Sequence, residues 1–105
     1  MEFLINGKVF DSDKAELLFD SGRYADGDSD GYLCDSQEKY YATNNGNFFK
    51  IIFSWQNTSL FRRKLLKDPE ICCCARDIND ICYIMNSFAD EKTKQKFKDK
   101  YLKEA

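Results

Sequence analysis

Residues 38–53 run Glu38-Lys39-Tyr40-Tyr41-Ala42-Thr43-Asn44-Asn45-Gly46-Asn47-Phe48-Phe49-Lys50-Ile51-Ile52-Phe53. Aromatic and β-branched residues on either side of a turn-forming segment are typical of a β-hairpin. We expect strands over residues 38–42 and 47–53, joined by residues 43–46. Aromatic pairs across two such strands each contribute up to ~1 kcal/mol. This hairpin is therefore predicted to form the centre of a sheet.

A second hairpin is predicted toward the N-terminus, over residues 2–10. Its turn is Asn6-Gly7, the dipeptide that best tolerates the positive φ angles of a type I′ turn. Acidic residues and a serine follow at positions 11–13, where they could cap a helix. We expect a short helix over residues 13–20, ended by Ser21-Gly22.

The C-terminal half continues with a loop over residues 54–59, a short helix over residues 60–67 and a strand over residues 71–75. A clear helix follows, because one apolar stripe is formed by Ile78, Ile81, Cys82, Met85 and Phe88. Asp77 is expected near its N-cap, and Asp90 is expected to cap a final helix that ends near Lys103.

Together these elements predict a single domain, residues 1–105, of the α+β class. The expected architecture is a small antiparallel sheet of about four strands, made of two hairpins. It is packed by a short N-terminal helix and two C-terminal helices.

Composition excludes several kinds of chemistry. The chain has 105 residues, a formal net charge of −2 and no histidine, so a Ser-His-Asp triad or a histidine-ligated zinc site cannot form. No phosphate-binding glycine loop occurs, and we expect neither an enzyme nor a cofactor. No apolar run approaches the ~20 residues of a membrane span or the ~7–15 of a signal peptide core, so a cytoplasmic protein is expected.

Five cysteines are present, and three of them are consecutive, at positions 72–74. Neighbouring residues of a strand point to opposite faces, so this run does not favour a ladder of disulfides. Free, buried cysteines in a reducing compartment are the expected state. The alternative is a cluster of three or four thiolates built from Cys72 and Cys74 with Cys34 or Cys82, but the paired spacing of zinc sites is missing and no metal is predicted.

Charge is distributed unevenly along the chain. Residues 1–45 carry ten acidic and four basic side chains, and residues 46–105 carry eight acidic and twelve basic ones, so the net charges are −6 and +4. The domain is therefore expected to present two charged surfaces to partners of opposite sign.

The acidic half contains a turn-rich segment in which Asp26, Asp28 and Asp30 occupy positions 1, 3 and 5 of an EF-hand loop. Position 12, normally a bidentate Glu, is Gln37. Weak calcium binding, a solvated turn and an acidic patch for a basic partner all remain open. We expect the last, with partner-binding residues Tyr24, Asp26, Asp28, Asp30, Tyr32 and Asp35.

The basic half offers a different interface. A cluster of cations near an aromatic residue could contact phosphates while the ring stacks on a base. The residues of this alternative nucleic-acid site are Trp55, Arg62, Arg63, Lys64 and Lys67, together with the C-terminal lysines. The isoelectric point of about 5.1 lies far below the value above ~9 that is typical of nucleic-acid-binding domains.

Two blocks of sequence resemble a known group of proteins. Residues 6–16, Asn-Gly-Lys-Val-Phe-Asp-Ser-Asp-Lys-Ala-Glu, are similar to a signature of short proteins encoded by phages and mobile elements of low-GC bacteria. Residues 41–49, Tyr-Ala-Thr-Asn-Asn-Gly-Asn-Phe-Phe, resemble the second block of the same group. Small proteins of this kind often inhibit host defence, as anti-CRISPR proteins do.

The resemblance implies a non-enzymatic, stoichiometric inhibitor that binds a CRISPR effector or another defence nuclease in the cytoplasm of the bacterial host. Its acidic surface would compete for the basic channels of such a complex. The alternative is a small nucleic-acid-binding accessory or regulatory protein of a mobile element. A third interpretation is an assembly factor that forms a homodimer through an exposed edge strand.

Overall fold

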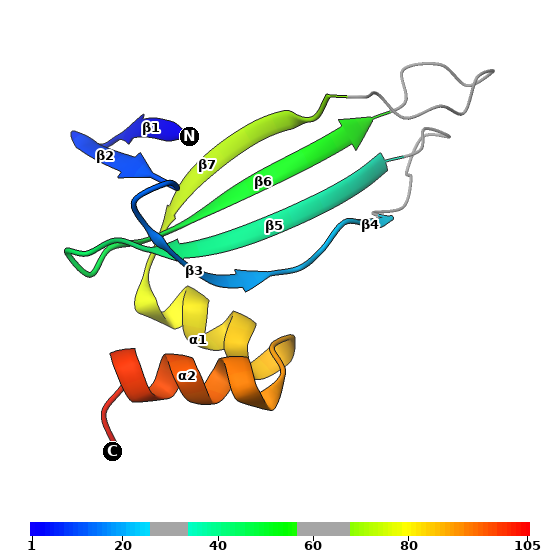
Figure 1. The fold of residues 1–105 in the computed structure, drawn as a ribbon. Coiled ribbons are helices and arrows are strands. Elements are labelled where there is room, and N and C mark those ends of the chain that lie inside the picture. The colour runs from blue at the N-terminus through cyan, green and yellow to red at the C-terminus, as the bar shows by residue number, and fades with distance from the viewer. Residues whose placement is uncertain (26–33, 57–67) are drawn as a thin grey trace.

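The structure is a computed structural model that describes residues 1–25, 34–56 and 68–105. Within these ranges, strands occupy the N-terminal part of the chain and two helices follow them (Figure 1). The elements are β1 (Glu2–Ile5), β2 (Lys8–Asp11), β3 (Glu16–Asp20), β4 (Tyr24–Ala25), β5 (Cys34–Ala42), β6 (Phe48–Gln56), β7 (Glu70–Arg76), α1 (Ile78–Ser87) and α2 (Glu91–Tyr101). The α+β class is thus confirmed.

The predicted central hairpin is confirmed and is longer than expected. β5 and β6 pair antiparallel from Ala42 opposite Phe48 to Cys34 opposite Gln56. The prediction of a loop from residue 54 is therefore wrong for residues 54–56, because Ser54 pairs with Ser36 and Trp55 with Asp35. The complete sheet has the order β3-β5-β6-β7, with β4 also paired to β5. It has five strands instead of four, and β1 and β2 form a separate two-stranded sheet.

The short N-terminal helix predicted over residues 13–20 is wrong. Residues 16–20 form β3, which pairs with β5 and starts with Glu16 opposite Ala42. A helix of so few residues is marginal by itself, whereas pairing with β5 satisfies the backbone and buries apolar side chains. A shift in register between Leu17 and Phe19 accommodates one extra residue, Leu18, whose side chain is buried against the helices.

The β1–β2 hairpin forms as predicted, with positive φ at Asn6 (51°) and Gly7 (74°). It packs on one face of the sheet, where the Phe10 and Phe49 ring centroids are 5.2 Å apart. The core of this face consists of Phe10, Tyr41, Phe49 and Ile51.

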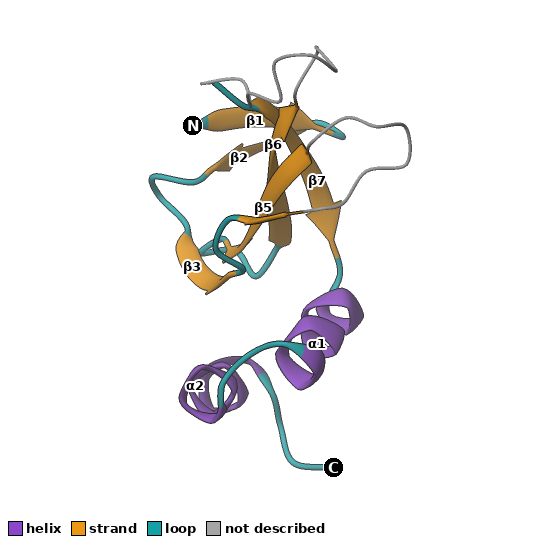
Figure 2. Cartoon of the chain, turned by 90° about the vertical axis from the view of Figure 1, so that its right-hand side faces the viewer, coloured by secondary structure: helices purple, strands orange, loops and turns teal. Residues whose placement is uncertain are grey.

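The two C-terminal helices lie below the opposite face of the sheet (Figure 2). Both predicted caps are confirmed: Asp77 forms a capping box with Asp80, and the Asp90 carboxylate accepts a hydrogen bond from the Thr93 backbone N–H over 2.7 Å. A second core joins the helices to this face through Leu18, Tyr40, Ala42, Phe48, Ile81, Met85 and Phe97. Full burial of a Leu, Ile, Met or Phe side chain contributes roughly 1.5–3 kcal/mol to the free energy of unfolding.

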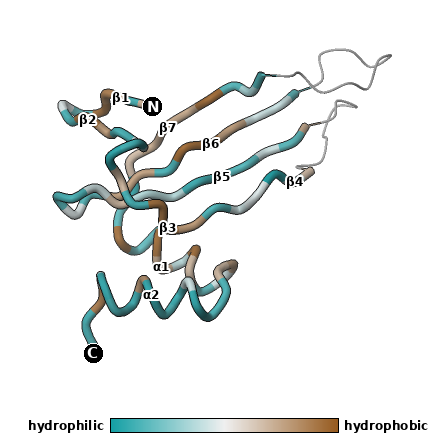
Figure 3. Tube along the Cα trace, in the orientation of Figure 1, coloured by the Kyte–Doolittle hydropathy of each residue, from teal (hydrophilic) through white to brown (hydrophobic). Residues whose placement is uncertain are grey.

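The two helices differ in polarity. α2 is hydrophilic along most of its length and has Phe97 as its buried residue, whereas α1 buries Ile81 and Met85 (Figure 3). Within the ranges that the structure describes, neither helix has the length and apolar character needed to cross a membrane.

Candidate partner-binding end of the sheet

Eight of the predicted site residues lie on two segments, 26–33 and 57–67, that are outside the described residues. They are Asp26, Asp28, Asp30, Tyr32, Arg62, Arg63, Lys64 and Lys67. The helix predicted over residues 60–67 and most of the EF-hand-like loop also fall there. Apart from the C-terminal lysines, the described residues of the predicted sites are Tyr24, Asp35 and Trp55.

The strands nevertheless show where both segments attach. Ala25 pairs with Asp35, Cys34 with Gln56, and Ser54 with Glu70, so β4, β5, β6 and β7 reach the same end of the sheet. We call this end, formed by Ala25, Cys34, Gln56 and Glu70, the distal end; the helices lie at the other end (Figure 1). The acidic and the basic candidate sites are therefore joined to the same place.

Arg23 organises the described part of the distal end. Its Nε donates a hydrogen bond to Asp35 Oδ2 over 2.9 Å, and its guanidinium carbon lies 4.0 Å from the centroid of the Trp55 ring. Trp55 is only 9% exposed. Asp35 is thus paired with a cation of its own chain, and the indole face that we predicted for base stacking is covered by Arg23. Stacking of Arg on Trp with a carboxylate partner fixes all three side chains.

Arg23 could not be identified from the sequence, because its contacts with Asp35 and Trp55 depend on the register of the strands. Only once residues 34–37 are known to be strand does Asp35 become a neighbour of Trp55. Gln37, the residue at the last EF-hand position, belongs to the same strand, and its Nε2 donates to Asp20 over 2.8 Å.

An aromatic strip extends from the distal end toward the β1–β2 hairpin on the face that carries Trp55. The Phe53 and Trp55 rings are stacked with centroids 6.2 Å apart, and Lys39 Nζ lies 5.6 Å from the Phe53 ring centroid. Ile71, paired with Phe53 in the neighbouring strand, is 44% exposed. Aromatic residues and Arg in an apolar setting are the composition enriched in protein–protein interfaces.

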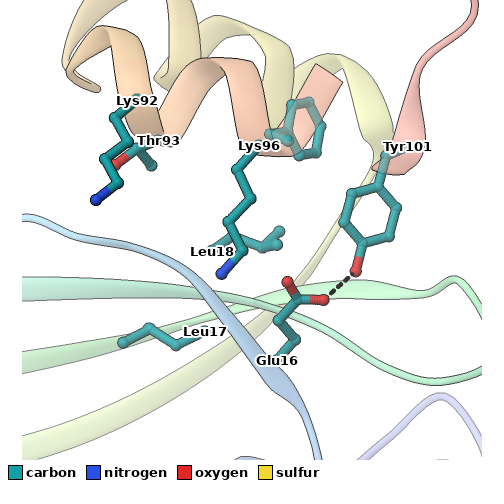
Figure 4. A pocket seen from close by; sticks show the side chains of 8 residues that line it. Glu16, Leu17, Leu18, Lys92, Thr93, Lys96 and Tyr101 are labelled. Carbon is teal, nitrogen blue, oxygen red and sulfur yellow. Dashed lines mark hydrogen bonds between the residues drawn. The ribbon is translucent and has the colours of Figure 1, made fainter. Parts of the chain in front are cut away.

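A second candidate surface is a cleft of about 260 Å³ between β3 and α2, at the opposite end of the molecule (Figure 4). Lys92 and Lys96 line it on the helix side, and Leu17 and Leu18 line it on the strand side. Glu16 is already engaged there, since it accepts hydrogen bonds from Lys100 and from Tyr101 Oη. These bonds lower the pKa of Glu16, so the carboxylate stays charged and paired at neutral pH.

All five cysteines are free, and Cys73 is half-buried. Burial raises the pKa of Cys73 to about 11, so its thiol is protonated at neutral pH. In residues 1–25, 34–56 and 68–105, no cluster of three or more His, Cys, Asp or Glu side chains is arranged to hold a metal ion. The alternative of a thiolate cluster is not assembled among these residues: Cys72 and Cys74 lie together without Cys34 or Cys82.

The two sequence blocks that resemble the phage-encoded group contact each other. Lys8 Nζ of the first block donates to Asn47 Oδ1 of the second over 3.4 Å, and Phe10 packs on Phe49. Asn6, Gly7 and Gly46 supply positive φ angles at the two turns. Residues of both blocks therefore pack one hairpin against the other. This structural role accounts for the types of side chain at these positions.

Comparison of the chain with protein-family models, with curated proteins and with solved structures finds no match. The resemblance of residues 6–16 and 41–49 therefore stays a prediction.

Proposed function

We propose that this chain is a non-enzymatic protein that binds and inhibits a host defence nuclease complex, of CRISPR type, and that it does so through the distal end of the sheet. The single observation that carries the proposal is that the strands flanking the acidic segment and the basic segment end together at the distal end, beside the aromatic strip. One partner could therefore be attracted electrostatically by the charged segments and could bury the aromatic strip on contact.

The acidic segment supplies the attraction. CRISPR effectors hold their nucleic acids in positively charged channels, and a surface rich in aspartate competes for such a channel. Asp26, Asp28 and Asp30 follow Arg23 by three to seven residues in the sequence. Arg23 is already paired with Asp35. The attraction accelerates association and weakens with salt.

The aromatic strip supplies the burial. Phe53 is half-buried, and its contacts with Lys39 and with the Trp55 ring hold it before binding, so little side-chain entropy is lost when a partner covers it. Tyr24, which is 39% exposed at the distal end, is the aromatic residue that we expect to anchor the partner.

The test is an affinity pull-down from a host lysate, followed by a cleavage assay with the nuclease that is captured. The triple variant Asp26→Lys, Asp28→Lys, Asp30→Lys is expected to lose both capture and inhibition while its thermal unfolding is unchanged. The matched control, Glu2→Lys, Asp99→Lys, Glu104→Lys, changes the net charge equally at exposed positions away from the distal end and is expected to keep both. Full inhibition by the first variant would exclude the acidic mechanism.

A second candidate function, nucleic-acid binding by an accessory or regulatory protein, is favoured by the lysines of α2. Lys92, Lys96 and Lys100 are spaced four residues apart, so they share one side of the helix, next to β3. A mobility-shift assay at several salt concentrations separates the two functions. Retarded DNA or RNA with a steep salt dependence supports this alternative, and no retardation supports the first proposal.

A further inference from the structure

Two of the three consecutive cysteines share one face of an edge strand. Cys72 and Cys74 lie on β7 with their Sγ atoms 4.0 Å apart, and the side chain of Cys73 points to the other face, toward the core of the β1–β2 hairpin. β7 is the last strand of the sheet order, Cys72 is exposed and Cys74 is half-buried. The pair is thus accessible to an ion from solvent.

The geometry of a strand disfavours a disulfide at this spacing. Residues two apart on one face are separated by about 6.6 Å along the strand, whereas a disulfide needs its two Cβ atoms within about 4.5 Å. One ion bound by both sulfurs needs no such contraction. With the zinc–thiolate bond length of about 2.3 Å as a guide, two sulfurs on one ion lie about 3.8 Å apart at a tetrahedral angle and about 4.6 Å apart when the three atoms are linear. The observed separation of 4.0 Å falls in this range.

Two cations and two carboxylates surround the pair. Lys50 lies opposite Cys74 in the neighbouring strand, and Arg76 follows on the same face of β7. Glu70 lies two residues before Cys72 on that face, and Glu38 accepts a hydrogen bond from Lys50 Nζ over 3.2 Å. Metal binding by thiols releases their protons, so the affinity of such a site increases with pH.

We propose that Cys72 and Cys74 form a two-coordinate site for a soft monovalent cation of the Cu(I) class. Thiolates select soft ions, and a two-coordinate ion needs no third ligand, which no His, Cys, Asp or Glu of the described residues supplies. On binding, each thiol releases one proton and forms one metal–sulfur bond, and copper stays in the +1 state. The resulting complex carries one negative charge, and Lys50 lies opposite Cys74 in the neighbouring strand.

The reduced, full-length chain is titrated anaerobically with Cu(I), added as its acetonitrile complex in competition with the chromophoric chelator bicinchoninate. We expect one strongly bound ion per chain, and an affinity more than about 100-fold lower in Cys72→Ser and in Cys74→Ser. The matched control is Cys73→Ala, which removes the neighbouring thiol on the opposite face. It should keep the affinity within about twofold.

Two results overturn the proposal. One is equal Cu(I) affinity in the wild-type chain and in the double variant Cys72→Ser, Cys74→Ser, which would assign binding to Cys34, Cys73 or Cys82. The other is a loss in Cys73→Ala as large as that in Cys72→Ser, with both variants folded by circular dichroism. Neither result bears on nuclease inhibition, which is measured separately.

Discussion

The phenolic hydroxyl of Tyr101 donates a hydrogen bond to the Glu16 carboxylate over 2.7 Å, and this bond joins the last turn of α2 to the edge strand β3. The same carboxylate oxygen accepts a hydrogen bond from Lys100. The Tyr101 ring also packs edge-on against Phe48, with centroids 5.6 Å apart. Since α2 buries Phe97 and is otherwise polar, this contact is a main attachment of the helix to the sheet.

Tyr101→Phe removes the hydroxyl and keeps the ring. A hydrogen bond to a charged acceptor contributes about 1.5–3 kcal/mol, and we expect the free energy of unfolding to decrease by that amount. Urea denaturation followed by circular dichroism measures it. Because ring packing is retained, an unchanged midpoint would show that water replaces the bond without loss.

The same contact predicts a pH dependence. The pKa of Glu16 is lowered in the folded state from 4.5, through hydrogen bonds from Lys100 and then Tyr101. A lowered folded pKa gives stability that is fully present above 4.5 and is lost as the pH falls through the folded pKa. The difference in unfolding free energy between wild type and Glu16→Gln should therefore be largest at neutral pH and shrink below pH 4.5. A constant difference across this range contradicts the assignment.

Arg23 predicts a spectroscopic effect at the distal end. Trp55 is the single tryptophan of the chain, and the Arg23 guanidinium covers its ring at 4.0 Å. Arg23→Ala should increase quenching of the fluorescence by acrylamide, because the indole becomes exposed. Lys39→Ala is the matched control, since its cation lies over Phe53 and not over Trp55. Equal quenching in wild type and Arg23→Ala would mean that other groups shield the ring.

Local signals in the sequence predicted the turns and caps of this fold. Asn6-Gly7 and the capping residues Asp77 and Asp90 act within a few residues of themselves, so their structure can be inferred without the rest of the chain. β3 could not be inferred in this way. Its residues carry apolar side chains that suit a helix or a strand, and pairing with β5, 19 to 26 residues away, decides between them.

The candidate site was predicted to a lesser extent for the same physical reason. Tyr24, Asp35 and Trp55 were selected for their chemistry, but their proximity follows from strand register, which the sequence pattern did not reveal beyond residue 38. Arg23 was missed because its partners are nonlocal. The sequence likewise did not show that the acidic and basic segments are attached at the same end of the sheet, because this follows from the order of the strands.

Gly7 offers a test of the N-terminal hairpin. It adopts φ 74°, and no atom lies within 4 Å of where a Cβ would be, so a substitution there acts through the backbone alone. Gly7→Ala should lower the free energy of unfolding by about 1 kcal/mol, and Gly7→Asn by less, because Asn tolerates the left-handed region. Thermal unfolding of the two variants measures the order. A larger loss for Asn than for Ala would exclude this explanation.

The last prediction follows from the distance between the lysines of α2 and the distal end of the sheet. Lys92 and Lys96 lie on α2, at the opposite end of the molecule from the strand ends that carry the acidic and basic segments (Figure 1). If the partner binds at the distal end, the double variant Lys92→Glu, Lys96→Glu should inhibit the captured nuclease as the wild type does. Interactions between exposed charges farther apart than the Debye length, about 8 Å at physiological salt, are largely screened. Loss of inhibition, accompanied by loss of any mobility shift with DNA or RNA, would instead place the functional surface on α2 and favour the nucleic-acid-binding alternative.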